Sequence, residues 1–226
     1  MVQLTPLQKD LLIGSLLGDG NLQTNTGKTW RYRAIHKALQ QTYLQKKYEI
    51  LQDFCAIPPS YSNVYDPRAG KCYDRWTFNT LYREEFQFYG NLFYKQENGK
   101  WVKHVPDNIA TFLTPTALAY WYMDDGALKW AGHSNAVRLC TDSFPGNEVE
   151  ILKNALESNF QLDVSINKKG GAKRISILEN SYSKLKDLIL PDLLPCMYYK
   201  FPDGNKGIYE GETVMEDLRF IPKDEL

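Results

Sequence analysis

Long hydrophobic runs and clustered cysteines are both missing from this sequence. No stretch of 18 consecutive apolar residues occurs, so the chain is not expected to span a membrane. Its first residues have no basic segment followed by an apolar one, so no secretory signal peptide is expected. The cysteines are widely spaced and form no Cys-x-x-Cys pair, which predicts buried, reduced thiols and argues against a zinc site. They are Cys55, Cys72, Cys140 and Cys196.

An excess of positive charge is missing as well. The 27 lysines and arginines are balanced by 27 aspartates and glutamates. This balance counts against a nucleic-acid-binding protein, because such domains are often basic. The distribution of charge matters more than the sum, however, and the bases gather in candidate strands whereas the acids gather in candidate helices. The 226 residues, 43% of them hydrophobic, are enough for one large domain or for two of about half that size.

Two similar stretches stand about half a chain apart, at residues 12–20 (LIGSLLGDG) and 118–126 (LAYWYMDDG). Each predicts an apolar helix that ends in an aspartate and then a glycine, the usual left-handed helix stop. Both helices also begin alike, with a Thr-Pro pair at Thr5 and at Thr114. An aspartate in a last helical turn is unfavourable by roughly 0.3–1 kcal/mol, so two such acids indicate a compensating cation, and paired carboxylates suit Mg²⁺.

These stretches resemble the paired motifs of the LAGLIDADG homing endonucleases, and the second resembles the version found in single-chain, omega-type intron endonucleases. The resemblance implies that the two helices pack at a pseudo-twofold axis. It also implies that the acids at the eighth motif positions, Asp19 and Asp125, are catalytic and hold the divalent metal. Asp124 at the seventh position and Tyr120 at the third replace residues that are usually small, so an asymmetric helix contact is expected.

The order helix, two strands, helix, two strands, helix is predicted twice, which gives an α+β fold of two αββαββα halves. Alternating patterns predict antiparallel sheets, each with one exposed face, and the resemblance implies that they form a DNA-binding saddle. In residues 71–79, Cys72, Trp76 and Phe78 are expected to face the core. The predicted division is an N-terminal half over 1–95, a linker over 96–112 and a C-terminal half over 113–226. The segment after Pro202 has no assignment.

Each half carries a lysine shortly before a proline, at Lys103 and Lys200. In the resembling family a basic residue in this region lies beside the metal and helps to orient or activate the attacking water, so both lysines are predicted to be catalytic. The alternative is that each is a solvated loop lysine. The assignment of Lys103 is the less secure of the two, because Lys100 and His104 are close to it in sequence.

The exposed strand faces are predicted to bind double-stranded DNA. Arginines suit guanine edges, asparagine and glutamine suit adenine, and lysines suit phosphates. For any single position, an ordinary solvated strand residue is an equally good interpretation. The candidates are Asn21, Gln23, Lys28, Arg31, Arg33, Arg68, Lys71, Tyr73, Arg75, Lys129, Arg138, Asn167, Lys168, Lys173, Arg174 and Ser176.

The prediction is a monomeric, site-specific homing endonuclease that makes an Mg²⁺-dependent double-strand break in a long DNA target and so promotes the mobility of its intron or reading frame. The alternatives are an intron RNA maturase, a non-cleaving DNA-binding regulator of the same fold, and a structural α+β module. An intracellular location, in an organelle or a bacterial cytoplasm, is expected. The C-terminal Lys223-Asp224-Glu225-Leu226 matches a retrieval signal of the endoplasmic reticulum but is interpreted as coincidence, because no entry signal is visible.

Overall fold

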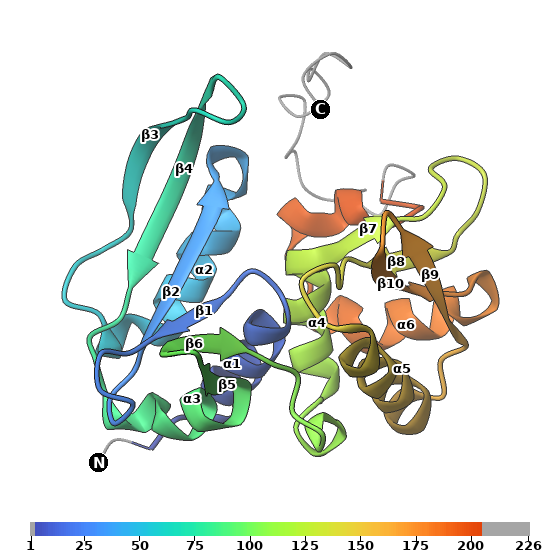
Figure 1. The fold of residues 1–226 in the computed structure, drawn as a ribbon. Coiled ribbons are helices and arrows are strands. Elements are labelled where there is room, and N and C mark those ends of the chain that lie inside the picture. Colours follow the sequence, from blue (N-terminus) through green and yellow to red (C-terminus); the bar gives the residue numbers. More distant parts are fainter. Residues whose placement is uncertain (1–2, 205–226) are drawn as a thin grey trace.

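The computed structural model describes residues 3–204, which form two similar halves on either side of a central pair of helices (Figure 1). The elements of the first half are α1 (Pro6–Leu17), β1 (Asn21–Gln23), β2 (Arg31–Lys37), α2 (Gln41–Leu51), β3 (Ser60–Asp66), β4 (Lys71–Asn79), α3 (Gln87–Phe93), β5 (Tyr94–Glu97) and β6 (Lys100–Lys103). Those of the second half are α4 (Pro115–Asp125), β7 (Gly126–Leu128), β8 (Val137–Leu139), α5 (Gly146–Phe160), β9 (Val164–Lys169), β10 (Ala172–Ile177) and α6 (Tyr182–Ile189).

The starts of α1 and α4 follow the sequence prediction. The Thr5 hydroxyl accepts a hydrogen bond from the Gln8 backbone, and the Gln8 side chain returns one to Thr5, which completes a capping box. Thr114 caps α4 through the backbone N–H of Ala117. Beyond their first turns, both helices are largely apolar and buried, as expected for helices enclosed by the rest of a domain.

The ends of α1 and α4 differ from the prediction. The expected left-handed stops are wrong, because neither Gly20 nor Gly126 has a positive φ. Helix α1 also ends at Leu17, so Asp19 lies beyond its last turn and not in it, and the residues that directly follow the two helices are Gly18 and Gly126. Glycine is needed here for space. A Cβ on Gly18 would lie 2.4 Å from the Cβ of Asp124, and a Cβ on Gly126 would lie 2.4 Å from the Tyr122 carbonyl oxygen.

The contact between α1 and α4 depends on a second glycine. A Cβ on Gly14 would lie 2.2 Å from the carbonyl oxygen of Ala117 and 2.7 Å from the Cβ of Tyr120. The backbone of α1 therefore approaches α4 more closely than any residue with a side chain allows. The bulky third motif position of α4 faces the small residue of α1, which is the asymmetric contact that the sequence predicted.

Each half contains a four-stranded antiparallel sheet, with strand orders β1-β2-β4-β3 and β7-β8-β10-β9. In β2 the buried residues Tyr32, Ala34 and His36 alternate with more exposed neighbours, so one face of the sheet packs on the core and the other is available for contact. Helices α2 and α5 pack against the inner faces of the two sheets. In the second sheet, β10 pairs with both β8 and β9.

The β3–β4 hairpin extends well beyond the other elements of its half (Figure 1). Of the three residues expected to face the core, Phe78 is buried and Trp76 packs partly against the core, but Cys72 is exposed. That prediction is wrong for Cys72 because the outer part of the hairpin has no core beneath it. The four thiols are free, as expected, but the other three are half-buried, so their predicted burial is only partial.

The predicted linker, residues 96–112, contains regular structure. Its first part belongs to the β5–β6 hairpin, whose turn residues Asn98 and Gly99 have φ of 49° and 76°. Positive φ at both positions matches the tight turn for which an Asn-Gly pair is the usual signal. Trp101 of this hairpin contacts Trp30 at a ring distance of 5.0 Å, which attaches the hairpin to the first half.

Among residues 3–204, no helix is both long and apolar enough to cross a membrane. The C-terminal Lys223–Leu226 tetrapeptide and most of the segment after Pro202 lie outside the described residues.

The helix contact predicts that Gly14→Ala destabilises the fold, by about 1–3 kcal/mol, because the added methyl group forces two backbones apart. Gly146→Ala is the matched control: its Cβ would meet only the flexible end of Lys173. Urea unfolding of both variants measures the effect. Equal stability of Gly14→Ala and wild type would contradict the close contact.

Candidate active site

The two motif acids lie at the same end of the central helix pair. Asp19 lies two residues beyond the end of α1, after Gly18, and its side chain is half exposed; Asp125 is the last residue of α4. Partial burial and the Asp124 carboxylate raise the pKa of Asp19. Burial, then Asp19 and Asp124, raise the pKa of Asp125 to about 8. The carboxylates therefore repel one another, which is the arrangement that the sequence predicted for a cation site.

Lys103 and Lys200 occupy equivalent places at the ends of the two motif helices. The Lys103 Nζ donates hydrogen bonds to the carbonyl oxygens of Leu16, Gly18 and Gly20, at 2.9–3.1 Å. The Lys200 Nζ donates to the carbonyl oxygens of Met123 and Asp124, at 2.6 and 2.7 Å. Burial lowers the pKa of each lysine, against the effect of the nearby carboxylates. Neither is a solvated loop lysine.

A buried cluster that the sequence analysis did not assign to the site surrounds Asp124. Its Oδ1 accepts hydrogen bonds from the Lys47 Nζ at 2.7 Å and from the Tyr43 hydroxyl at 2.8 Å, and its Oδ2 accepts one from the Asp19 backbone N–H at 3.2 Å. The side chains of Asp124 and Lys47 are both completely buried. Burial acts to raise the pKa of Asp124, but Lys47 and His36 hold it below its usual value.

A signal for this cluster was present in the sequence. Lys47 falls among Tyr43, Ile50, Leu51 and Phe54 at the helical spacing of an apolar face, where a lysine needs a buried partner. The partner lies in the other half of the chain, 77 residues away, so no local pattern identifies it.

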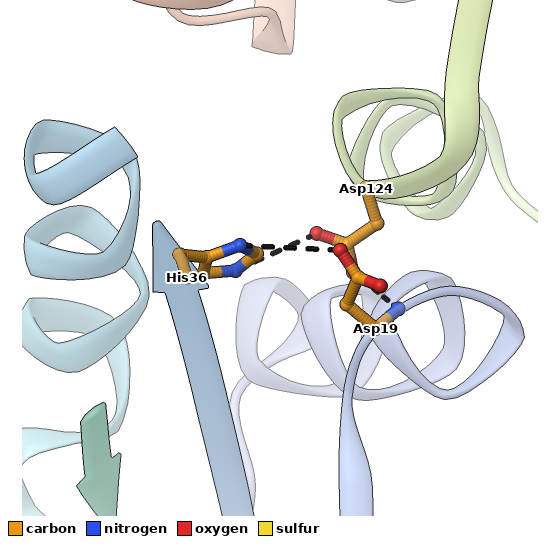
Figure 2. A group of neighbouring side chains, drawn as sticks. All are labelled: Asp19, His36 and Asp124. Atoms are coloured by element: carbon orange, nitrogen blue, oxygen red, sulfur yellow. Dashed lines mark hydrogen bonds and ion pairs between the residues drawn. The ribbon is translucent and has the colours of Figure 1, made fainter. Parts of the chain in front are cut away.

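His36, at the end of β2, completes the cluster. Its Nε2 lies 3.1 Å from the Lys47 Nζ, and its Nδ1 lies 4.0 Å from Asp19 Oδ2. Burial and the Lys47 ammonium lower the pKa of His36 to about 3, so the imidazole is neutral. Figure 2 shows how His36 projects from its strand toward Asp124 and Asp19.

Among the described residues, one group has the geometry to hold a metal ion: ligand atoms of Asp19, His36 and Asp124 lie within 4.8 Å of one another. The Lys47 ammonium already contacts both His36 and Asp124, however, and supplies the positive charge there. Asp19 and Asp125 keep their mutual repulsion, and their oxygen ligands suit a hard divalent cation. The chemistry of these two acids therefore fits a divalent metal.

Most of the predicted DNA-contacting residues occur on the outer sheet faces or exposed turns. Antiparallel pairing places Asn21 opposite Arg33 and Gln23 opposite Arg31 in the first sheet. In the second sheet, Asn167 lies opposite Arg174, whose guanidinium is held by Asp142 at 2.7 Å. The remaining exposed or half-exposed candidates are Lys28, Arg68, Lys71, Tyr73, Arg75, Lys129, Arg138 and Lys168.

Two candidates in β10 depart from this arrangement. The Lys173 Nζ lies 3.1 Å from the Glu150 carboxylate on α5, so the Lys173 side chain faces this helix. Neighbouring residues of a strand point to opposite faces, and Lys173 therefore points away from the face that carries Arg174. Ser176 is only 3% exposed and accepts a hydrogen bond from the Asn167 side chain at 2.7 Å, so it supports Asn167 and has little surface of its own. His104, the alternative to Lys103, is bound to Glu148 at 2.7 Å and not to a motif helix.

The profile of the LAGLIDADG DNA endonuclease family matches residues 9–185 of this chain. The chain belongs to this family. It is 48% identical to the DNA endonuclease I-ChuI of Chlamydomonas applanata over 216 residues, covering 91% of this chain and 99% of that protein. It is 30% identical to a probable intron-encoded endonuclease of Wickerhamomyces canadensis, covering 87% and 84% of the two chains.

Among solved structures, the homing endonuclease I-WcaI bound to its DNA recognition sequence superposes with a TM-score of 0.80, at 27% identity and 88% coverage of each chain. The predicted family, the α+β fold with antiparallel sheets and the DNA endonuclease class are thereby confirmed.

The raised pKa of Asp125 predicts a pH-dependent stability in metal-free buffer. Its folded value of about 8 exceeds the unfolded value of 3.8, so its contribution is fully present below pH 4 and is lost as the pH rises toward 8. Asp125→Asn should therefore exceed the wild type in stability at pH 9, by roughly 2–4 kcal/mol, and match it near pH 4. Urea unfolding in EDTA measures this, with the exposed Asp107→Asn as the control. A constant difference across this range would refute the charge repulsion.

Proposed function

We propose that this LAGLIDADG protein is a site-specific homing endonuclease that cuts both strands of a long DNA target with Mg²⁺ and so promotes the mobility of its intron or reading frame. The observation that carries the proposal is the meeting of Asp19 and Asp125 at one end of the motif helices, each helix end also held by a buried lysine. One chain supplies both acids, which supports action as a monomer.

Asp19 and Asp125 would hold the divalent metal, which supplies charge stabilisation and activation of water in phosphodiester hydrolysis. The two lysines place positive charge beside the acids and fix the helix ends on which the acids stand. They differ in one respect. Lys103 uses all three of its N–H donors on backbone carbonyls, whereas Lys200 makes two such bonds within residues 3–204. Within that part of the chain, Lys200 therefore has one more donor for water or phosphate.

The outer faces of the two sheets would bind the DNA on either side of the scissile phosphates. A two-stranded ribbon fits the major groove, and a strand of about eight residues covers about 26 Å, or about eight base pairs. The long β3–β4 hairpin, with Tyr73 and Arg75, would contact the outer part of one half-site. A maturase or a non-cleaving regulator would need the sheets but not this arrangement of acids and lysines, so the site favours cleavage.

Asp19→Asn and Asp125→Asn should each abolish or cripple double-strand cleavage while leaving DNA binding largely intact. The amide keeps the shape of each side chain but removes the charge that holds metal. Cleavage of a target plasmid and gel-shift binding in metal-free buffer measure the two properties separately. Cutting of both strands at the wild-type rate by either variant would show that the acid merely ends a helix.

Lys103→Ala and Lys200→Ala should slow cleavage by about 10²-fold without abolishing it, because the metal supplies the larger share of catalysis. The free donor of Lys200 predicts the larger loss for that variant and an accumulation of nicked plasmid. An assay that separates supercoiled, nicked and linear DNA measures this, with the exposed Lys100→Ala as the control. Full-rate conversion to linear product by both lysine variants would rule out the assignment.

A further inference from the structure

Among the residues that the structure describes, the buried cluster around Asp124 has no counterpart at the second motif acid. Asp124 holds the seventh position of the second motif, and Gly18 holds the same position of the first. The Asp124 side chain crosses from α4 to the first half, where it receives the Asp19 backbone N–H. Gly18 has no side chain with which to do the same for Asp125. The two acids of a pseudo-symmetric site are therefore supported in different ways.

The direction of each hydrogen bond in the cluster follows from the groups present. The Lys47 ammonium has only donors, so it donates both to Asp124 Oδ1 at 2.7 Å and to His36 Nε2 at 3.1 Å. A neutral imidazole that accepts at Nε2 carries its proton on Nδ1. The Nδ1 atom lies 4.0 Å from Asp19 Oδ2, near enough for the N–H dipole to act on that carboxylate, and the Gln40 side chain is also hydrogen-bonded to the imidazole.

We propose that Asp124, Lys47 and His36 form a buried relay that positions Asp19, so that the two DNA strands are cut by active sites with unequal support. The relay runs from the Asp124 carboxylate through the Lys47 ammonium to the Nδ1–H of His36, and Asp124 also fixes the Asp19 backbone. Asp124, Lys47 and His36 are positioning residues: Lys47 supplies a resident cation, and Asp124 does not bind metal. The role in cleavage rests on the proposed endonuclease function, whereas the tautomer of His36 does not.

The test uses the paired variant Lys47→Met/Asp124→Asn in the full chain. This pair removes both charges together and so leaves no isolated buried ion, and the amide oxygen still accepts from the Asp19 N–H. The matched control is Lys153→Met/Glu157→Gln, the same two chemical changes at an ion pair on α5 with a 2.8 Å contact. Unfolding curves identify any variant that fails to fold. A variant that does not fold is replaced by Lys47→Met/Asp124→Leu, which makes the pair fully apolar.

The first readout is independent of cleavage. Long-range ¹H–¹⁵N spectra of the imidazoles, in metal-free buffer, distinguish a protonated Nδ1 from a protonated Nε2, and the chain has only three histidines to assign. His36 should carry its proton on Nδ1 in the wild type and in the control, and should shift toward the other tautomer in the paired variant. A protonated Nε2 in the wild type, or no change in the paired variant, would overturn the relay.

The second readout is the single-turnover cleavage rate of each DNA strand, followed with a different label on each strand. The paired variant should slow one strand at least tenfold more than the other, whereas the control keeps the wild-type ratio. Equal slowing of both strands would reduce the cluster to a structural ion pair and overturn the proposal, as would wild-type rates on both. Failure of the wild type to cut any target would instead count against the proposed function and would leave the tautomer result standing.

Discussion

The close contact between α1 and α4 is the constraint on which the rest of the structure depends. Gly14 allows two helix backbones to approach to a distance that excludes even a methyl group, and this approach brings the ends of both helices together. The acids at those ends come from positions 106 residues apart in the chain, yet Asp19 raises the pKa of Asp125. Each sheet then extends outward from its own helix, so the geometry of one contact sets the position of both acids and both sheets.

Placing two helix ends together concentrates negative charge, because the last carbonyls of each helix add to the carboxylates. Two kinds of contact offset this negative charge. Lys103 and Lys200 bind the free carbonyls directly, and Lys47 neutralises Asp124. Asp19, in contrast, still raises the pKa of Asp125. Charge is thus compensated more fully at Asp124 than at Asp19 and Asp125, where we propose that a divalent metal binds.

Much of this arrangement could be predicted from the sequence, because the relevant signals are local. The caps at Thr5 and Thr114, the acids near the helix ends and the alternation along β2 are all short patterns. The features that were missed depend on distant contacts. The exposure of Cys72 follows from how far a hairpin extends beyond its core, and the partner of Lys47 lies in the other half.

The motif glycines also show what a sequence pattern leaves out. At Gly20 and Gly126 the residue type was noticed but the reason was wrong, because a sequence shows that a side chain is missing and not what occupies the space. A Cβ at these positions would meet Ser15 and Tyr122 of the preceding helices, and one at Gly18 would meet Asp124 across the helix contact, which only the packed structure reveals.

The most direct test of the central claim is to locate the metal in a crystal of the protein bound to target DNA, by anomalous scattering from Mn²⁺. We predict a peak between the carboxylates of Asp19 and Asp125, with the Lys47 ammonium still bound to Asp124. A peak held instead by Asp19, His36 and Asp124, with Lys47 displaced, would contradict the account.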